Sequence, residues 1–488
     1  MNFLKQFSSI IFLFLITISN TLNAQKNHFN VKDFGAKGDG ITDDTDAIKK
    51  AKVKVEEQGG TIFFPKGNYI SGIIDIKPKL NKEIIFKGEK GTVIQKKIND
   101  PINVALFFCE VSKAKLKFDN LILEGNFLKR DRNWKSVNSH TIDVDDPTSG
   151  IYVYNVHTLE VNNCEIKNFH GDGIAMYHGE IFKAYFNKIE NVSVNGIHTH
   201  KINLSDIKEN LIKNTGLVFS EIILDNKKQF YNPKKYQTNF GDGILDISKE
   251  SVISKNKIFN SGRVGIVHDL AQDVGFEKSK VQVFNNEVEL DDERVNSNNP
   301  PAGMWFEQTA TVIVKNNKIR LGKSQYPIAT GIRFYNITDK IEVINNYIFS
   351  ESKVDTNEAI GVFEPNRIKE ILINENVFEG NFKSAITFSY EKPYASVTLL
   401  KILNNEFFPS KVSKAFLTMS VYRQNNYPYK MIVSGNNIKK DLKLFELSYF
   451  GKFIKKDIVS NLELKNNIVN NKLSNEKPNL DFIKVSYE

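Results

Sequence analysis

The stretch Gly173-Ile174-Ala175-Met176-Tyr177 and its counterpart Gly196-Ile197-His198-Thr199-His200 decide the fold that we expect. Each begins with glycine and an apolar residue and continues as a short alternating segment. The pattern recurs along the chain, and its copies start at Gly150, Gly173, Gly196, Gly216, Gly243, Gly265, Gly303, Gly331 and Gly361, with Ala385 as a last variant. The first three copies are 23 residues apart. No copy carries the 3.6-residue periodicity of a helical repeat, so the pattern predicts a solenoid of coils with three short strands each.

A second column of residues follows the same period. An asparagine that is followed by one or two residues and then by Ile, Val or Phe recurs at Asn163, Asn187, Asn210, Asn256, Asn286, Asn317, Asn346, Asn376, Asn405 and Asn467, and Asn437 is assigned to the same column. Amide side chains at equivalent turns of stacked coils can hydrogen-bond to one another along the axis. We therefore interpret this column as structural and not as catalytic.

The N-terminal region contains a distinctive motif. The run from Asp33 to Gly40, followed by Thr42-Asp43-Asp44-Thr45, precedes a predicted helix from Asp46 to about Glu57 and a turn at Gly59-Gly60. Asp43 and Asp44 suit the N-cap and the dipole of that helix. Over residues 30–72 this opening resembles the pectate-lyase-like superfamily, which includes polysaccharide lyases, polygalacturonases, mannuronan epimerases and phage tailspikes. The resemblance implies an all-β, right-handed parallel β-helix with an N-terminal capping helix.

We expect three segments along the chain. Residues 1–24 have an early Lys5, an apolar run from Ile10 to Ile18 and small residues up to Ala24, which is typical of a signal peptide. Residues 25–72 would form the N-terminal cap, and residues 73–488 the coils, with loop insertions flanking one sheet. No later run reaches the roughly 20 apolar residues of a membrane span. The sequence therefore predicts an exported protein, periplasmic or secreted, that does not insert into a membrane.

The composition restricts the partners. The formal charge of +9 favours acidic partners such as polyuronates or sulfated glycans. Neither zinc-finger spacing nor a basic helix supports nucleic acid as a partner. Only two cysteines are present, so a disulfide framework is not expected.

Strand alternation predicts which side chains point outward from one sheet of the solenoid. The expected outward pairs are Tyr152 and Tyr154, Ala175 and Tyr177, His198 and His200, Val218 and Ser220, Leu245 and Ile247, Val267 and Asp269, Trp305 and Glu307, Arg333 and Tyr335, Phe363 and Pro365, and Thr387 and Ser389. Insertions at 125–148, 224–240, 289–301, 320–329 and 349–359 end just before strands of this sheet. Loops beside one face form the walls of a groove, so we expect the binding site here.

The first group of outward residues is the histidine–tyrosine cluster, which we define as Tyr154, Tyr177, His198 and His200. We expect these four residues to be catalytic, with Arg130 and Arg132 on the preceding loop binding substrate beside Trp134 and His140. The group suits β-elimination from a uronic acid, because a cation or donor neutralises the carboxylate while His or Tyr removes the proton on carbon 5. A second Tyr can protonate the leaving oxygen. If the leaving group is a sugar the enzyme is a lyase, and if it is a terminal hydroxyl the enzyme is a dehydratase that expels water.

The second group is the carboxylate cluster, defined as Asp269, Trp305, Glu307, Arg333 and Tyr335. We expect it to extend the binding groove, with Trp305 as the best platform for stacking a sugar ring. Asp269 and Glu307 also form a carboxylate pair of the kind that glycosidases use, so hydrolysis is an alternative. The two clusters are expected about five coils apart, roughly 24 Å, because coils repeat about every 4.8 Å.

Comparison with families of the superfamily favours elimination. Polygalacturonases carry three acidic motif positions, of which Gly171-Asp172-Gly173 keeps one. Mannuronan epimerases place catalytic Asp and His at the two outward positions after a Gly-Phe pair, and here those positions hold His198 and His200. The sequence therefore predicts a carbohydrate-active enzyme on an anionic polysaccharide or its oligosaccharides. A non-catalytic glycan-binding, adhesin-like or tailspike-like β-helix is the remaining alternative.

No cofactor is expected. A calcium ion is the one metal that the sequence suggests, because Asp143, Asp145 and Asp146 form a loop cluster of oxygen ligands at suitable spacing.

Overall fold

The structure is a computed structural model, in which most of the chain after residue 26 is described. The described residues are 27–79, 81–98, 100, 104–110, 113–126, 149–216, 221–224, 227–230, 241–270, 278–290, 302–322, 330–351, 358–390, 396–421, 429–449, 462–474 and 484–485.

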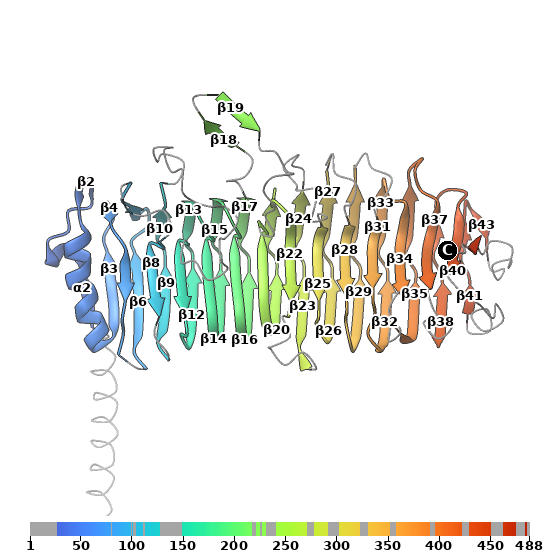
Figure 1. Cartoon of the computed structure of the whole chain (residues 1–488), viewed down its shortest axis with the longest axis horizontal. Coiled ribbons are helices and arrows are strands. Elements are labelled where there is room, and N and C mark those ends of the chain that lie inside the picture. Colours follow the sequence, from blue (N-terminus) through green and yellow to red (C-terminus); the bar gives the residue numbers. More distant parts are fainter. Residues whose placement is uncertain are drawn as a thin grey trace, which may run out of the picture.

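The chain winds into a long solenoid of stacked coils, with the N-terminal helix at one end (Figure 1). A typical coil has three strands, such as β25 (Ala302–Glu307), β26 (Thr311–Lys315) and β27 (Lys318–Leu321). Each strand pairs in parallel with its equivalent in the next coil: β28 (Thr330–Tyr335), β29 (Lys340–Ile344) and β30 (Tyr347–Ser350). The predicted right-handed parallel β-helix is confirmed.

The first sheet, as we name it, carries the first strand of each coil. Besides β25 and β28 it contains β5 (Ile74–Ile76), β8 (Phe107–Glu110), β11 (Ile151–Tyr154), β14 (Ile174–Tyr185), β16 (Ile197–Lys208), β20 (Ile244–Ser254), β22 (Val264–Asp269), β31 (Glu358–Phe363), β34 (Ser384–Tyr390), β37 (Ala415–Val421), β40 (Lys443–Tyr449) and β44 (Lys484–Val485).

The second sheet contains β26, β29, β1 (His28–Asn30), β3 (Gly60–Phe64), β6 (Glu83–Gly88), β9 (Lys115–Asp119), β12 (Thr158–Asn162), β23 (Lys280–Phe284), β32 (Ile368–Asn374), β35 (Val397–Leu403), β38 (Lys430–Ser434) and β41 (Leu462–Lys465). Long strands β14, β16 and β20 run from the first sheet into the second and join the two into one 26-stranded sheet.

The third sheet has 16 strands. They are β27, β30, β2 (Asp39–Asp43), β4 (Asn68–Ser71), β7 (Val93–Lys96), β10 (Ile122–Glu124), β13 (Glu165–Phe169), β15 (Lys188–Val192), β17 (Leu211–Thr215), β21 (Lys257–Phe259), β24 (Glu287–Leu290), β33 (Val377–Gly380), β36 (Glu406–Pro409), β39 (Asn437–Ile438), β42 (Ile468–Val469) and β43 (Lys472–Leu473). A separate antiparallel hairpin is formed by β18 (Glu221–Leu224) and β19 (Lys227–Phe230).

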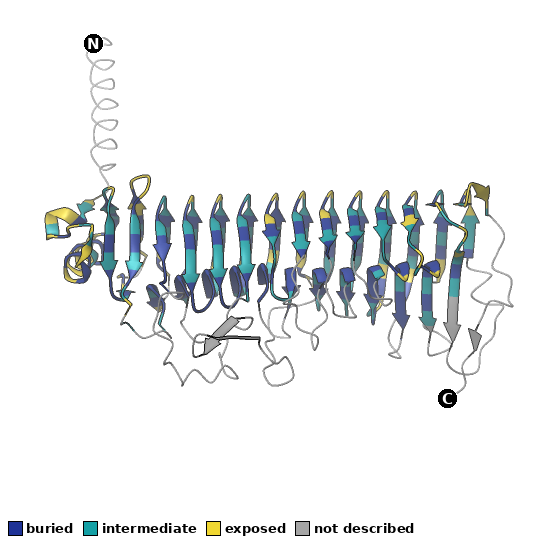
Figure 2. Cartoon of the chain, turned by 90° about the horizontal axis from the view of Figure 1, so that it is seen from above, coloured by how far each residue is buried: buried dark blue, intermediate teal, exposed yellow. Residues whose placement is uncertain are grey.

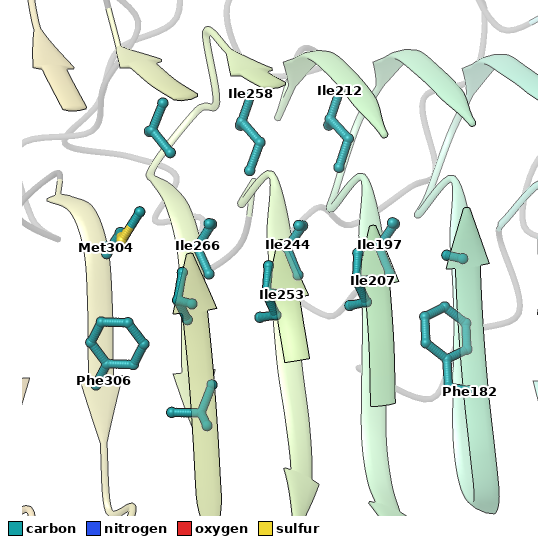
Figure 3. Packing of buried hydrophobic residues seen from close by; sticks show 14 of the residues in the cluster. Phe182, Ile197, Ile207, Ile212, Ile244, Ile253, Ile258, Ile266, Met304 and Phe306 are labelled. Atoms are coloured by element: carbon teal, nitrogen blue, oxygen red, sulfur yellow. The ribbon is translucent and has the colours of Figure 1, made fainter. Parts of the chain in front are cut away.

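The core lies inside the coils, where inward side chains of successive coils stack in rows. Ile197, Ile244, Ile266 and Met304 form one such row on the first sheet (Figure 3). All four are fully buried. Burying an aliphatic side chain of this size contributes about 1.5–3 kcal/mol, and the solenoid gains this stabilisation again with each coil. Figure 2 shows buried and half-buried positions along the strands, as alternation predicts.

The asparagine column forms a continuous buried ladder. In each step the side-chain Oδ1 of one Asn accepts both the backbone N–H and the side-chain amide of the preceding Asn, as between Asn286 and Asn317. The ladder runs through Asn187, Asn210, Asn256, Asn286, Asn317, Asn346, Asn376, Asn405, Asn436 and Asn467.

Two predicted members of this column were wrong. Cys164, and not Asn163, stands in line with Asn187 and donates its backbone N–H to it. Asn163 adopts the left-handed conformation and its amide contacts Asp119. In the same way Asn436, and not Asn437, continues the ladder.

The N-terminal cap is helix α2 (Thr45–Gln58), preceded by the short 3₁₀ helix η1 (Val31–Phe34). This confirms the helix predicted from Asp46 to about Glu57. Asp44 occupies the N-cap position, but its side chain makes no capping hydrogen bond to the helix. Its carboxylate accepts the N–H groups of Lys37 and Gly38 instead. Among the described residues, no helix is long and apolar enough to cross a membrane.

Two expected column positions were wrong. Gly361 pairs with Arg333, and Phe363 pairs with Tyr335, so the outward pair of that coil is Gly361 and Phe363 and not Phe363 and Pro365. Gly216 does not begin a strand of the first sheet, because β16 pairs directly with β20 and Ile197 is the partner of Ile244. Gly216 instead ends the turn after β17, where its φ is 70°. Val218 and Ser220 lie outside the described residues. The long insertion between Gly216 and Gly243 therefore belongs to a single coil.

Candidate active site

The outward residues of the first sheet form two rows that run along the solenoid. One row contains, coil by coil, Tyr152, Ala175, His198, Leu245, Val267, Trp305 and Arg333. The other contains Tyr154, Tyr177 and His200 on β11, β14 and β16, and Asp269, Glu307 and Tyr335 on β22, β25 and β28. The structure therefore places both predicted clusters on one face, in the predicted register.

The two clusters are nearer to each other than the sequence suggested. His200 on β16 and Asp269 on β22 are separated by the single coil of β20, because Gly216 does not start a coil. Two steps of about 4.8 Å put these strands roughly 10 Å apart. The coil between them is apolar: Leu245 packs with Val267, and Ile247 lies against them.

Burial divides the histidine–tyrosine cluster into a deep and a shallow pair. Tyr177 and His198 are each 1% exposed, whereas Tyr154 and His200 are half-buried. Tyr177 packs against the ring of Tyr152. Tyr154 and His200 are thus partly exposed at the surface of the first sheet, whereas Tyr177 and His198 are covered by the side chains around them.

The deep pair belongs to a hydrogen-bonded relay. The Tyr177 hydroxyl lies 3.0 Å from Nδ1 of His198, and the same Nδ1 lies 3.2 Å from Oδ2 of Asp172. Nδ1 can hold one proton, and an ionised Asp172 can only accept it. The arrangement therefore favours an Nδ1–H imidazole shared between the carboxylate and the Tyr177 oxygen. Nε2 of His198 is buried, has no hydrogen-bond partner within the described part of the chain, and carries the lone pair in this tautomer.

Asp172 is itself held by the neighbouring coils. It is 6% exposed, and its Oδ1 accepts the backbone N–H of Asn195. The Asn195 amide oxygen in turn accepts the N–H of Asp242 on the next coil. Arg263 donates through Nε and Nη2 to the Asp242 carboxylate. A ladder of residues that precede the column glycines thus fixes the acid behind His198.

His178 is a site residue that alternation did not predict. After Tyr177 the pattern would place the next side chain inward, but His178 has a φ of 53°, which is uncommon for a residue of this size. Its ring lies 4.9 Å from that of Tyr154 and is stacked 6.0 Å from that of His200. Left-handed residues follow the second outward position in other coils too, as at Asn155. The sequence could have indicated this site residue, because a His stands at a left-handed corner position that Asn adopts at a lower conformational cost.

The carboxylate cluster centres on Asp269 and Glu307, which are partners on adjacent strands. Burial, and then the nearby Glu307 carboxylate, raise the pKa of Asp269 to about 7, while Arg263 acts in the opposite direction. Oδ1 of Asp269 is buried and has no hydrogen-bond partner among the described residues. A carboxyl group with such a pKa can donate a proton near neutrality.

The aromatic platform is partly occupied by protein groups. The Arg333 guanidinium lies 4.5 Å from the Trp305 ring and 4.7 Å from the Phe363 ring, between the two. The Trp305 indole N–H donates to Glu307 at 3.2 Å. Arg333 therefore covers one face of the ring that the sequence predicts as the best stacking platform, and stacking of a sugar on Trp305 stays a prediction. Burial lowers the pKa of Arg333 from its usual range.

Several predicted residues lie outside the described part of the chain. These are Arg130, Arg132, Trp134 and His140, together with the calcium candidates Asp143, Asp145 and Asp146. Among the residues that the structure describes, no group of three or more His, Cys, Asp or Glu could hold a metal ion. Calcium binding by the loop acids stays a prediction.

The sequence is similar to known polysaccharide-active proteins. A family described as "Rhamnogalacturonase A/epimerase, pectate lyase-like" matches residues 28–269. Alginate lyase 7 of Azotobacter vinelandii is 59% identical over 46 residues, which are 9% of this chain and 5% of that protein. The chain thus matches only a small fraction of the length of this relative.

Solved structures share the fold at low sequence identity. The A-module of mannuronan C-5 epimerase AlgE6 from Azotobacter vinelandii has a TM-score of 0.58 at 15% identity, covering 84% of this chain and 99% of that module. The A-module of AlgE4 from the same organism has a TM-score of 0.52 at 14% identity and covers 94% and 100%. The coils, the capping helix and these matches together show the right-handed parallel β-helix fold of the pectate-lyase-like superfamily, with the family match itself limited to residues 28–269.

Proposed function

We propose that the protein is an exported enzyme that acts on a uronic-acid-containing polysaccharide, or on its oligosaccharides, by β-elimination at the histidine–tyrosine cluster. The observation that carries the proposal is the relay from Tyr177 through His198 to Asp172, with half-buried His200 and Tyr154 beside it. The family match, and the similarity to an alginate lyase and to mannuronan epimerase modules, support a uronate substrate.

The roles follow from burial and contact. His200 is shallow enough to take the proton from carbon 5, and Tyr154 lies on the same row two coils away to protonate the leaving oxygen. Tyr177 can serve at the same carbon, because a hydrogen bond from His198 stabilises its phenolate. His198 and Asp172 act through Tyr177 and are positioning residues in this scheme. Loss of the proton and departure of the carbon 4 oxygen, as alcohol or water, leave a carbon–carbon double bond.

Neutralising the substrate carboxylate requires a cation or a strong donor. His178, stacked on His200, is the described residue best placed for this. Arg130 and Arg132 remain proposed for the same task. The carboxylate cluster would then bind sugar units that extend along the groove.

Substitution of Tyr177 and His200 tests the proposal. Removing a proton-transfer group costs about a hundred- to ten-thousandfold in rate, so Tyr177→Phe and His200→Ala are each expected to abolish detectable unsaturated product. The measurement is ultraviolet absorbance of the conjugated uronate, with mass spectrometry of the product, on alginate, pectin, ulvan and chondroitin. Tyr185→Phe and His157→Ala are matched controls, since both residues lie near the second sheet, and both should retain full activity. Normal activity of Tyr177→Phe and His200→Ala would exclude the cluster as the reaction site.

Hydrolysis at the carboxylate cluster is the second candidate. It is favoured by the pairing of Asp269 with Glu307 and by the raised pKa of Asp269, which suits a general acid. If elimination is correct, Glu307→Gln should mainly raise KM. An inactive Glu307→Gln enzyme together with a nearly normal His200→Ala enzyme, and products that have gained water, would make hydrolysis the activity.

A further inference from the structure

A polar network lies inside the solenoid, directly beneath the candidate site. The second inward row of the first sheet is apolar at Val153 and Met176, and apolar again at Phe306. Between them the same row holds Thr199, Asp246 and His268 on three successive coils. All three have no exposed surface. A buried carboxylate and a buried imidazole are costly, so their place in this otherwise apolar row requires a reason.

The network is connected and reaches the backbone of the site. Oδ1 of Asp246 accepts hydrogen bonds from the hydroxyls of Thr199 at 2.6 Å and Ser248 at 2.7 Å. Thr199 also accepts the backbone N–H of Ile247, at the point where the register between β16 and β20 shifts after His200. The buried Thr199 hydroxyl thus bonds to a backbone N–H of β20 at the irregularity that follows His200.

His268 connects the network to the carboxylate cluster. Its Nε2 lies 3.0 Å from the Ser248 carbonyl oxygen and 3.4 Å from Oδ2 of Asp246. Its Nδ1 lies 2.9 Å from the Thr309 hydroxyl, which in turn lies 3.0 Å from the carbonyl oxygen of Glu307. His268 itself precedes Asp269 in β22.

These contacts accommodate two proton states with the same heavy-atom positions. Thr309 has one hydroxyl proton. If His268 is neutral, Nε2–H donates to Ser248 and Thr309 donates to Nδ1. If His268 is protonated, Nδ1–H donates to Thr309, the hydroxyl turns to the Glu307 carbonyl, and the Asp246 carboxylate balances the charge. The two states differ by one proton and one hydroxyl rotation.

We propose that Asp246, His268 and Thr309 form an internal proton switch that changes the charge and the hydrogen bonding beneath the two outward clusters as pH changes. Among the described residues, Asp246 is the charged group that acts on His268, while Ser248, Thr199 and Thr309 face the pair as neutral donors and acceptors. Burial lowers the pKa of His268, and Asp246 opposes that shift. The switch therefore operates below neutral pH.

The sign of the stability effect follows from this direction. Because the folded pKa lies below the unfolded value of about 6.5, the unfolded chain takes up the proton first as pH falls. The contribution of His268 to stability is thus complete above about pH 6.5 and is lost as pH falls toward the folded pKa. The pH-dependent contribution of Asp269, on the outer face of the same strand, has the opposite sign. Each variant is therefore compared with the wild-type protein, in which Asp269 makes the same contribution.

The first experiment needs no substrate. Melting temperatures of the full chain are measured from about pH 7.5 to 5 for the wild-type protein, His268→Gln and Asp246→Asn. His268→Gln is expected to lose less melting temperature on acidification than the wild-type protein, because the substituted side chain takes up no proton. Asp246→Asn removes the charge that favours the imidazolium, so its loss should exceed that of the wild-type protein. Parallel curves for all three proteins would overturn the switch.

The second experiment tests the link to the site and rests on the proposed function. Thr309→Ser keeps the hydroxyl and Thr309→Val removes it with little change in shape. Thr309→Ser should retain the pH profile of kcat/KM for elimination, whereas Thr309→Val should displace the acidic limb of that profile. Identical profiles for the two variants would overturn the link. If the wild-type protein forms no unsaturated product, the proposed function fails, and the melting curves, with Thr309→Val in place of a His268→Gln chain that does not fold, still decide the switch.

Discussion

Asp269 connects the ionisation of a single side chain to the stability of the folded chain. Its folded pKa of about 7 is far above the value of about 3.9 that an unfolded Asp has. Between these values the folded state holds a proton that the unfolded state lacks. The stabilising contribution is therefore complete below about pH 4 and is lost as pH rises through about 7.

Replacement of this carboxyl group gives a prediction. Asp269→Asn cannot ionise, so its melting temperature should fall less than that of the wild-type protein between about pH 5 and 8. Circular dichroism melts in a pH series measure the difference. Val267→Ala on the same strand is the control, because it lowers stability without changing its pH dependence. Equal slopes for the wild-type protein and Asp269→Asn would show that Asp269 is ionised throughout.

The sequence predicted the direction of a side chain correctly within strands, where residues alternate, and incorrectly at turns. Tyr177 and His200 face outward as expected, because strand residues alternate. His178 and Asp172 were missed as site residues. The first lies at a left-handed corner, and the second precedes its column glycine, outside the strand.

At the scale of the element, the asparagine ladder holds the coils together at one corner. The Asn317 amide donates to Val283, Lys315 and Asn346, and its oxygen accepts two hydrogen bonds from Asn286. Asn317 is 2% exposed, so water cannot replace these bonds in full.

Truncation of one ladder residue is expected to be costly. Asn317→Ala leaves several buried groups unpaired, at about 1–3 kcal/mol for each, and should lower the melting temperature without changing the catalytic pH profile. Asn203→Ala is the matched control, because that amide is exposed and bonds only to Glu180 among the described contacts. A melting temperature equal to that of Asn203→Ala would contradict a structural role of the ladder.

At the scale of the whole molecule, the remaining prediction concerns export. Residues 1–24 have the composition of a signal peptide and lie outside the described residues. Protein recovered from the periplasm or medium of an expressing bacterium should lack them. Intact-mass measurement gives the first residue directly, and material that still starts at Met1 would refute the assignment. Replacing the apolar run from Ile10 to Ile18 with polar residues should keep the protein in the cytoplasm.

The sequence by itself determined the architecture. Its period near 23 residues, the apolar alternation and the N-terminal motif fixed a parallel β-helix, because each coil repeats the same local pattern and stacks on its neighbour. The outward residues Tyr177, His200 and Glu307 followed from the same alternation.

Tertiary structure alone decided which of these residues act together. The insertion after Gly216 hid the true number of coils, so the nearness of His200 to Asp269 could not be read from sequence distance. Contacts across coils, such as Asp172 to His198 or Asp246 to His268, join residues 22 or more positions apart. The local sequence determines whether a strand residue points inward or outward. The number of residues in each corner determines which side chains lie beside one another, and that number varies from coil to coil.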